Sequence, residues 1–101
     1  MVECLVAELD HVIVAYSLFF TSFSTFKVKP GIWLEDLYVL PEMRGQGIGK
    51  TLLSTVVESA KERGYGRVEW SVLDWNESAI TFYERLGATV MPDWRICRVS
   101  L

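Results

Sequence analysis

The sequence contains few of the residues that bind metals or form disulfides. It has two cysteines, Cys4 and Cys97, and a single histidine, His11. The cysteines lie far apart, and neither belongs to a spacing that is typical of a zinc site. We therefore expect no bound metal, and the simplest interpretation of the cysteines is two reduced thiols in the core.

An excess of basic charge and a long apolar segment are also absent. Ten Lys and Arg against 13 Asp and Glu residues give a formal net charge of −3, which argues against nucleic-acid binding. The longest apolar run, residues 12–20, is much shorter than the roughly 20 residues of a membrane-spanning helix. It also lacks the basic flank and cleavage site of a secretory signal. The sequence predicts a cytoplasmic protein without a membrane or nucleic-acid partner.

The length and the patterning of the chain predict one small domain over residues 1–101, since half of the residues are hydrophobic and can form one core. Residues 2–9 and 12–20 are apolar and β-branched around Asp10-His11, which predicts a hairpin. Residues 32–40 predict a third strand. Strict alternation would place its side chains on two faces, Trp33, Glu35, Leu37 and Val39 on one and Leu34, Asp36, Tyr38 and Leu40 on the other.

The second half of the sequence alternates between helical and strand patterns. Apolar residues recur at helical spacing from Ile48 to Ala60, and Gly64 is suited to end that helix. Residues 67–73 predict a fourth strand, and Asn76 is a suitable N-cap for a short helix that ends at Gly87. Residues 95–101 predict a final strand, and residues 88–91 are a candidate for an additional short one. The expected order is β-β-β-α-β-α-β, an α/β sandwich with a mixed sheet and a right-handed parallel crossover.

The sequence RGQGIGKT, residues 44–51, contains three glycines on alternate positions before the predicted helix. A Walker A loop needs a glycine where Arg44 stands, and the dinucleotide fingerprint G-x-G-x-x-G needs one at Lys50 or Leu52. A plain tight turn remains an alternative. One glycine would suffice for it, and each further glycine costs about 0.5–1 kcal/mol of backbone entropy.

Glycines at a strand-to-helix turn are suited to hold an anion against the backbone. The unpaired N–H groups of the first helical turn point at such a ligand, with the positive end of the helix dipole behind them. Arg44 and Lys50 add positive charge to an otherwise acidic protein. The pattern predicts a phosphate-bearing ligand that is held mainly by backbone amides.

These residues resemble a known family. RGQGIG matches the Arg/Gln-x-x-Gly-x-Gly/Ala signature of the GNAT superfamily of acyl-CoA-dependent N-acyltransferases. LED at residues 34–36 and WNE…FYERLGA at residues 75–88 resemble the branch of spermidine/spermine and thialysine acetyltransferases. The resemblance extends from about Val6 to the C-terminus and implies a GNAT-like fold that lacks the usual N-terminal strand and helices.

The resemblance implies acetyl-CoA as the co-substrate, with the pyrophosphate in the glycine loop. The pantetheine arm would pair with the third strand like an added strand, which requires the third and fourth strands to splay apart. In the family a bulge in this strand aims an N–H at the thioester carbonyl, but no bulge is visible in the sequence. The coenzyme-binding residues expected on this basis are Leu37, Tyr38, Val39, Arg44, Gly45, Gln46, Gly47, Ile48, Gly49, Lys50, Asn76, Ser78 and Ala79.

The implied reaction is acetyl transfer to a primary amine of a small molecule, such as a polyamine or thialysine, by direct attack. Tyr83 matches the family's tyrosine acid, which protonates or hydrogen-bonds the departing thiolate. Its helical spacing from Ile80 and Leu86 also fits a core aromatic residue. The alternative function is a catalytically inactive module that binds acyl-CoA or forms dimers.

Glu35 matches the amine-binding glutamate of the family. On the predicted face it shares an apolar, partly dry pocket with Trp33, where a carboxylate can attract an amine and take its proton. An exposed or salt-bridged glutamate is the alternative. Asp36 is expected on the other face in a structural role. Weaker candidates for the acceptor site are Trp70, Asp74 and Trp75, which fit core packing equally well, and Asp93.

Most family members carry a further strand and two helices before the hairpin, whereas this sequence begins almost at the hairpin. The acceptor wall is then either missing from a minimal form or supplied by a second chain. An uncovered sheet face and the hydrophobic edge of residues 2–9 favour a homodimer, and exchange of strands is one way to form it.

Overall fold

A computed structural model describes residues 1–24, 29–92 and 96–101. They fall into two compact units, Met1–Ser71 and Val72–Leu101, called here the first and the second unit. The first unit holds a four-stranded sheet of β1 (Val2–Leu9), β2 (Val12–Ser24), β3 (Lys29–Val39) and β4 (Val68–Glu69), in that order. The β1–β2 and β2–β3 pairs are antiparallel and the β3–β4 pair is parallel, as the predicted mixed sheet requires.

The turn between β1 and β2 has the backbone geometry of a tight hairpin. Asp10 and His11 adopt φ values of 51° and 66°, in the left-handed region. Two consecutive residues in this region make the turn type that matches the right-handed twist of paired strands. The predicted hairpin is therefore confirmed. β2 ends at Ser24, beyond the predicted end at residue 20.

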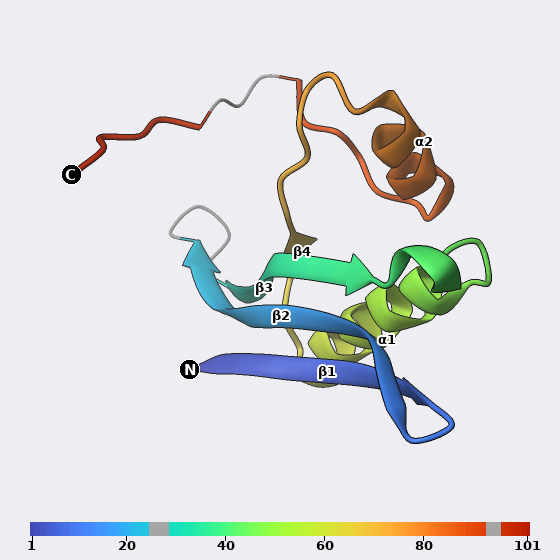
Figure 1. Ribbon diagram of the computed structural model, residues 1–101. Coiled ribbons are helices and arrows are strands. Elements are labelled where there is room, and N and C mark those ends of the chain that lie inside the picture. Colours follow the sequence, from blue (N-terminus) through green and yellow to red (C-terminus); the bar gives the residue numbers. More distant parts are fainter. Residues whose placement is uncertain (25–28, 93–95) are drawn as a thin grey trace. The chain divides into compact units, whose positions relative to one another are not determined.

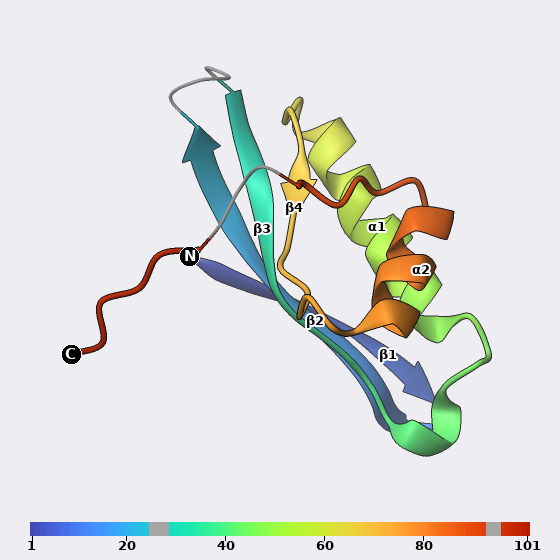
Figure 2. The same cartoon turned by 90° about the horizontal axis from the view of Figure 1, so that it is seen from above.

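Helix α1 (Ile48–Glu62) lies along one face of this sheet (Figures 1 and 2). A short 3-10 helix, η1 (Pro41–Met43), precedes it. The predicted apolar stripe of α1 packs on the sheet, and Gly64, at φ 73°, follows the helix end as expected. The core consists of Val14, Ala15, Phe19, Ile32, Leu34, Leu52, Leu53, Val56 and Ala60, all of them buried.

β3 carries one residue more than the stretch of β2 opposite it. Phe19 pairs with Leu34 and Leu18 pairs with Asp36, so Glu35 has no partner on β2. An extra residue of this kind is a β-bulge, and it shifts the alternation of all later side chains by one position. A bulge, which the resemblance implies and the sequence does not reveal, is thus present in the strand before the glycine loop.

The bulge makes the predicted faces of β3 wrong beyond Leu34. Leu37 pairs with the buried Ser17 and lies on the face that α1 covers. Trp33 pairs with Phe20, and Asp36 with Leu18, which places both on the opposite face. This opposite face is called the outer face below. Strict alternation fails because it assumes an equal residue count on the two paired strands.

The second unit contains α2 (Glu77–Arg85). The Oδ1 atom of Asn76 accepts a hydrogen bond from the Ala79 amide at 3.2 Å, and Gly87, at φ 94°, follows the helix, so both predicted ends are confirmed. Residues 88–91 and 96–101 form no strand, contrary to prediction. Alternating apolar residues become a strand only with a pairing partner. The predicted residue Asp93 lies outside the described residues.

Two other expectations concern the cysteines and the membrane. Cys4 and Cys97 are free and exposed, so their prediction as core thiols is wrong. Cys4 pairs with Leu18 and therefore lies on the outer face of the sheet, away from α1. Among the described residues, no helix is long and apolar enough to cross a membrane.

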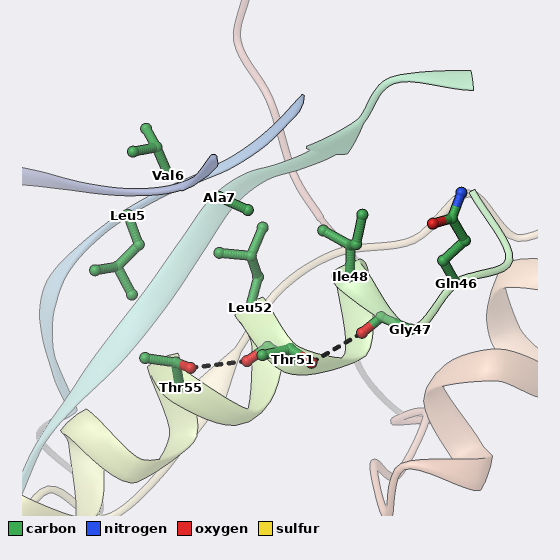
Figure 3. Close-up of a pocket in the computed structure, with 9 residues that line it drawn as sticks. All are labelled: Leu5, Val6, Ala7, Gln46, Gly47, Ile48, Thr51, Leu52 and Thr55. Carbon is green, nitrogen blue, oxygen red and sulfur yellow. Dashed lines mark hydrogen bonds between the residues drawn. The ribbon is translucent and has the colours of Figure 1, made fainter. Parts of the chain in front are cut away.

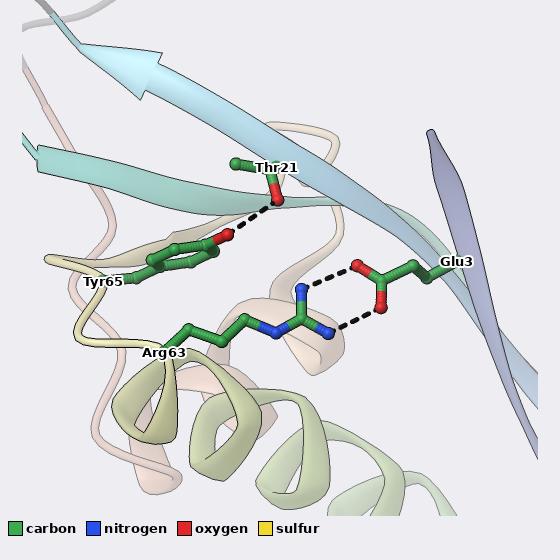
Figure 4. Close-up of polar contacts among 4 residues, drawn as sticks. All are labelled: Glu3, Thr21, Arg63 and Tyr65. Atoms are coloured by element: carbon green, nitrogen blue, oxygen red, sulfur yellow. Dashed lines mark hydrogen bonds and ion pairs between the residues drawn. The ribbon is translucent and has the colours of Figure 1, made fainter.

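A hydrogen-bonded ion pair ties the edge strand β1 to the end of α1 (Figure 4). The Arg63 guanidinium donates to both carboxylate oxygens of Glu3, at 2.7 and 2.5 Å. Next to it, the Tyr65 and Thr21 hydroxyls are 3.1 Å apart, and the Arg63 guanidinium carbon lies 5.9 Å from the Tyr65 ring centroid. The hydrogen bonds from Arg63 hold the pKa of Glu3 below its ordinary value.

We predict that Glu3→Gln lowers the stability of the folded protein at neutral pH. The variant should also lose less stability than the parent when the pH falls. A carboxyl with a lowered folded-state pKa stabilises the protein above its ordinary pKa of 4.5. That contribution is lost as the pH falls through the folded-state pKa. Urea midpoints at pH 7 and pH 3 measure the effect, with Glu58→Gln as control, because Glu58 pairs with Lys61 on the exposed helix surface. Equal midpoint losses at both pH values would contradict it.

Candidate functional site

The loop between β3 and α1 needs two of its three glycines for its backbone conformation. Gly45 and Gly47 adopt φ values of 82° and 83°, which other residues adopt at a cost of about 1–2 kcal/mol. One glycine would therefore not suffice, contrary to the sequence argument. Gly49 is different, because it lies inside α1, and a Cβ there would make an ordinary contact of 3.5 Å with a Val39 methyl group. Its lack of a side chain is not required by the turn.

The first turn of α1 leaves its amides open. Gly47 is the N-cap residue and contributes no side-chain hydrogen bond, and Thr51 N donates to Gly47 O at 3.0 Å. The N–H groups of Ile48, Gly49 and Lys50 therefore have no acceptor within the helix. The first turn contains no acidic residue, so the positive end of the helix dipole is not neutralised there. This is a suitable place for an anion.

The two basic side chains of the loop, Lys50 and Arg44, point in different directions. The Lys50 side chain is exposed on the first turn of α1. The Arg44 side chain instead turns back onto β3, where its Nε donates to Val39 O at 3.0 Å and its guanidinium carbon lies 5.7 Å from the Tyr38 ring centroid. A role of Arg44 at a bound phosphate stays a prediction.

The strand before the loop has an open edge within the first unit. β4 pairs with β3 only at Ile32 and Trp33, although the sequence predicted a longer fourth strand. Leu40 N donates to Val14 O on β2, so the N–H and C=O of the preceding Val39 point away from β2. Within the described first unit, β3 beyond Trp33 therefore offers backbone groups to a ligand that adds like a strand, as the predicted splay requires.

The two carboxylates at the bulge differ from their predictions. Glu35 is exposed, and its Oε2 accepts from the Trp33 indole N–H at 2.8 Å, so the predicted apolar pocket is wrong and the alternative of an exposed glutamate holds. Asp36 Oδ2 accepts from the Tyr16 hydroxyl at 2.9 Å. The prediction that Asp36 turns away from the face of Trp33 is wrong, because the bulge lies between them.

Sequence reasoning missed Tyr16. Its ring centroid lies 5.8 Å from that of Tyr38, its cross-strand partner, and the hydrogen bond to Asp36 raises the pKa of its phenol. Tyr16 could be identified from the register of β2 against β3, and this register depends on the bulge at Glu35. No local motif around Tyr16 indicates it.

A cavity of about 300 Å³ lies between β1 and α1 (Figure 3). Leu5, Ile48 and Leu52 form much of its apolar wall. The hydroxyls of Thr51 and Thr55 donate to helix carbonyls at 2.9 and 2.8 Å, so they are already engaged. The lining contains no charged residue.

In the second unit, α2 carries the predicted acid. Tyr83 is partly buried, its ring packs edge-on to Phe82 at 5.5 Å between centroids, and burial raises the pKa of its phenol. Asn76 Oδ1 also accepts from the Ser78 hydroxyl at 3.2 Å. Asp74 and Trp75 are exposed, which excludes core packing for these two. Roles of α2 residues toward the glycine loop stay predictions.

No group of three His, Cys, Asp or Glu residues within the described ranges could hold a metal ion. Residues 2–88, which include the glycine loop and α2, match the family model described as the acetyltransferase (GNAT) family. The chain belongs to the GNAT family. The match covers the loop whose open amides and glycine geometry are described above.

Known proteins similar to this GNAT chain include L-ornithine N5-acetyltransferase NATA1 of Arabidopsis thaliana, 44% identical over 91 residues, which are 90% of this chain and 40% of that protein. Thialysine N-epsilon-acetyltransferase of Bos taurus is 43% identical over 94 residues, which cover 85% of this chain and 55% of that one. The chain thus spans about half the length of these curated relatives. An integron cassette protein from the mobile metagenome of V. cholerae shares the GNAT-like fold, with a TM-score of 0.91 at 23% identity over 98% of this chain and 61% of that chain.

We predict that alanine affects stability differently at two glycines of the GNAT loop. Gly47→Ala should lower the free energy of unfolding by about 1–2 kcal/mol, because it places a side chain in the left-handed region. Gly49→Ala should leave it unchanged or raise it by up to about 1 kcal/mol, since this residue is already helical. Urea unfolding measures both, and a Gly47→Ala variant as stable as the parent would contradict the backbone argument.

Proposed function

We propose that this protein transfers an acetyl group from acetyl-CoA to a primary amine of a small molecule by direct attack. The observation that carries the proposal is the set of open amides at the first turn of α1, next to the open edge of β3, in a GNAT chain. The relatives are named for acetylation at N5 of ornithine and N-epsilon of thialysine, so a small-molecule amine is the acceptor that we propose.

The coenzyme fits the residues that the loop and β3 present. In the proposal, the amides of Ile48, Gly49 and Lys50 bind the pyrophosphate, and the Lys50 ammonium adds charge. The Val39 N–H, which faces away from β2, pairs with the pantetheine arm, whereas the Val39 carbonyl already accepts from Arg44 Nε. The coenzyme supplies the activated acyl group. The other expected coenzyme-binding residues line the path of the coenzyme, as the resemblance implies; they are residues 37, 38 and 44–47.

Glu35 binds the acceptor amine in this proposal and takes its proton directly or through water. Among the described residues, the Trp33 indole engages only the Oε2 atom of Glu35, and the side chain is exposed, so a cationic amine can reach the other oxygen. The bulge at Glu35 supports a backbone N–H that is aimed at the acyl carbonyl, which is the role that the resemblance implies for it.

Tyr83 is the proton donor in this proposal. Its raised pKa keeps the phenol protonated at neutral pH, as a donor to a departing thiolate must be. Asn76, Ser78 and Ala79 contact the coenzyme arm at the start of α2. Asn76 uses its Oδ1 atom for the helix cap, which leaves its amide NH₂ group for a ligand.

We further propose that residues 1–101 act as one acyltransferase domain, in the cytoplasm and as a homodimer. Val2 and Val6, on the edge strand β1, are 63% and 47% exposed, which supports a partner chain at this side. A second chain would also supply an acceptor wall. Sedimentation at micromolar concentration should give the mass of two chains, and the mass of one would contradict the dimer.

One observation favours a second candidate function. Glu35 is exposed instead of lying in a pocket, as an acyl-CoA-binding module without amine turnover would allow. Thiol release from acetyl-CoA with polyamines, lysine analogues and small amines, together with CoA calorimetry, separates the two. Binding with turnover supports the enzyme, and binding without turnover supports the module. Absence of both would refute the coenzyme site.

We predict that Tyr83→Phe lowers kcat by about 100-fold or more and leaves CoA affinity nearly unchanged, because in this proposal the hydroxyl acts on the departing thiolate and not on the bound coenzyme before reaction. Steady-state kinetics and calorimetry measure the two quantities. Tyr65→Phe is the matched control, since it removes a tyrosine hydroxyl that hydrogen-bonds Thr21 instead. Similar losses in kcat and affinity would contradict the role of Tyr83.

A further inference from the structure

One hydrogen bond holds the carboxylate that the proposed function assigns to the acceptor amine. The Trp33 indole N–H donates to Glu35 Oε2 at 2.8 Å. The bulge leaves Glu35 without a residue directly opposite on β2, so its side chain lacks the usual cross-strand neighbour. Glu35 is exposed, and a glutamate side chain in such a place samples several rotamers. The bond to the indole therefore selects one position of the carboxylate.

Trp33 is a firmly anchored donor. Its backbone pairs with Phe20 on β2 and with Glu69 on β4, so it has a neighbouring strand on each side. Its side chain is partly buried, and an indole has few rotatable bonds to immobilise. The indole nitrogen can only donate, which suits it to a carboxylate. Trp33 can therefore hold Glu35 at a low cost in conformational entropy.

The place of Trp33 along β3 connects this hydrogen bond to the open edge of the strand. Trp33 is the last residue of β3 that pairs with β4, so the open edge begins directly after it. Val39 lies at the other end of this edge, beside Gly49 in the first turn of α1. Roughly 13 Å of extended strand separate Val39 from Glu35, at about 3.3 Å per residue. An arm that follows the edge away from a phosphate at α1 therefore runs toward Glu35.

We propose that Trp33 is a positioning residue, which holds the Glu35 carboxylate beside the end of the open edge so that its second oxygen meets the acceptor amine. This inference rests on the proposed function and explains how an exposed Glu35 acquires the fixed geometry that a pocket would otherwise supply. Trp33 does not touch the acceptor and acts through Glu35. The amine is thereby held in a defined place relative to the acyl group that it attacks.

The neighbouring carboxylate provides a matched comparison. Asp36 accepts a hydrogen bond from the Tyr16 hydroxyl at 2.9 Å, so each of two successive carboxylates has one aromatic donor. Tyr16 belongs to β2 and its bond leads to Asp36, whereas the bond of Trp33 leads to Glu35. Removal of either donor costs one hydrogen bond to an exposed carboxylate. Only the loss of the indole N–H acts on the residue that binds the amine in this proposal.

The test is a double-substitution cycle on acetyl transfer to the most active amine of the panel. Trp33→Phe keeps an aromatic ring and should lower kcat/KM for the amine by about 10-fold, mainly through KM, with CoA affinity unchanged. In a Glu35→Ala background, followed by single-turnover rates, the same substitution should have little further effect, because no carboxylate is left to hold. Tyr16→Phe is the control, and its effect should be equal in both backgrounds.

Equal losses from Trp33→Phe in the two backgrounds would overturn the inference, because Trp33 would then act through the fold and not through Glu35. Coupling of Tyr16 to Glu35 of the same size would overturn it as well, as would a Glu35→Ala variant as active as the parent. If urea unfolding shows that Trp33→Phe does not fold, benzothienylalanine at this position takes its place in the cycle. Its ring has the shape of the indole and lacks the N–H.

If the unaltered protein acetylates no amine of the panel, the proposed function fails by itself. Calorimetry of L-ornithine and 1,4-diaminobutane with the parent and the same variants, in excess CoA, then decides the inference. Amine binding that Trp33→Phe weakens in the parent but not in the Glu35→Ala background supports it. Binding that is absent from the parent, or weakened equally in both backgrounds, refutes it.

Discussion

The packing of α1 across one face of the sheet is the interaction on which the rest of the protein depends. Val56 and Ile32 are fully buried in this contact, and burial of such side chains contributes about 1.5–3 kcal/mol each. The same contact brings Gly49 close to a Val39 methyl group at the end of β3. Open helix amides and an open strand edge therefore lie together as a result of core packing, and a phosphate and an extended arm can be recognised by backbone.

The bulge at Glu35 is the second constraint, and it acts on side chains. By adding one residue to β3, it turns Leu37 toward the core and Asp36 toward the outer face. Each of the two neighbouring carboxylates then meets an aromatic donor, the Trp33 indole for Glu35 and the Tyr16 hydroxyl for Asp36. A local irregularity in backbone register thereby defines the chemistry of a whole surface.

Features with local causes could be predicted from the sequence. The hairpin at Asp10, the helix that begins after Gly47 and the cap at Asn76 each follow from residues within one turn of the feature. Features that depend on a distant partner could not. Tyr16 meets Asp36 only through cross-strand register, and the alternation of residues 96–101 predicts a strand that finds no pairing partner among the described residues. Cys4 is exposed because it lies on the sheet face that α1 does not cover, and its own sequence neighbours do not reveal which face that is.

The ion pair between Glu3 and Arg63 has a consequence for the edge of the sheet in acid. Glu3 lies on β1, whose outer edge has no neighbouring strand in the described sheet. Protonation of Glu3 removes one half of the ion pair and leaves the positive charge of Arg63 unpaired beside the strand. The tie between β1 and α1 then weakens, while the buried apolar side chains of the core keep their contacts. Acidic conditions should therefore loosen the edge strand before the core itself unfolds.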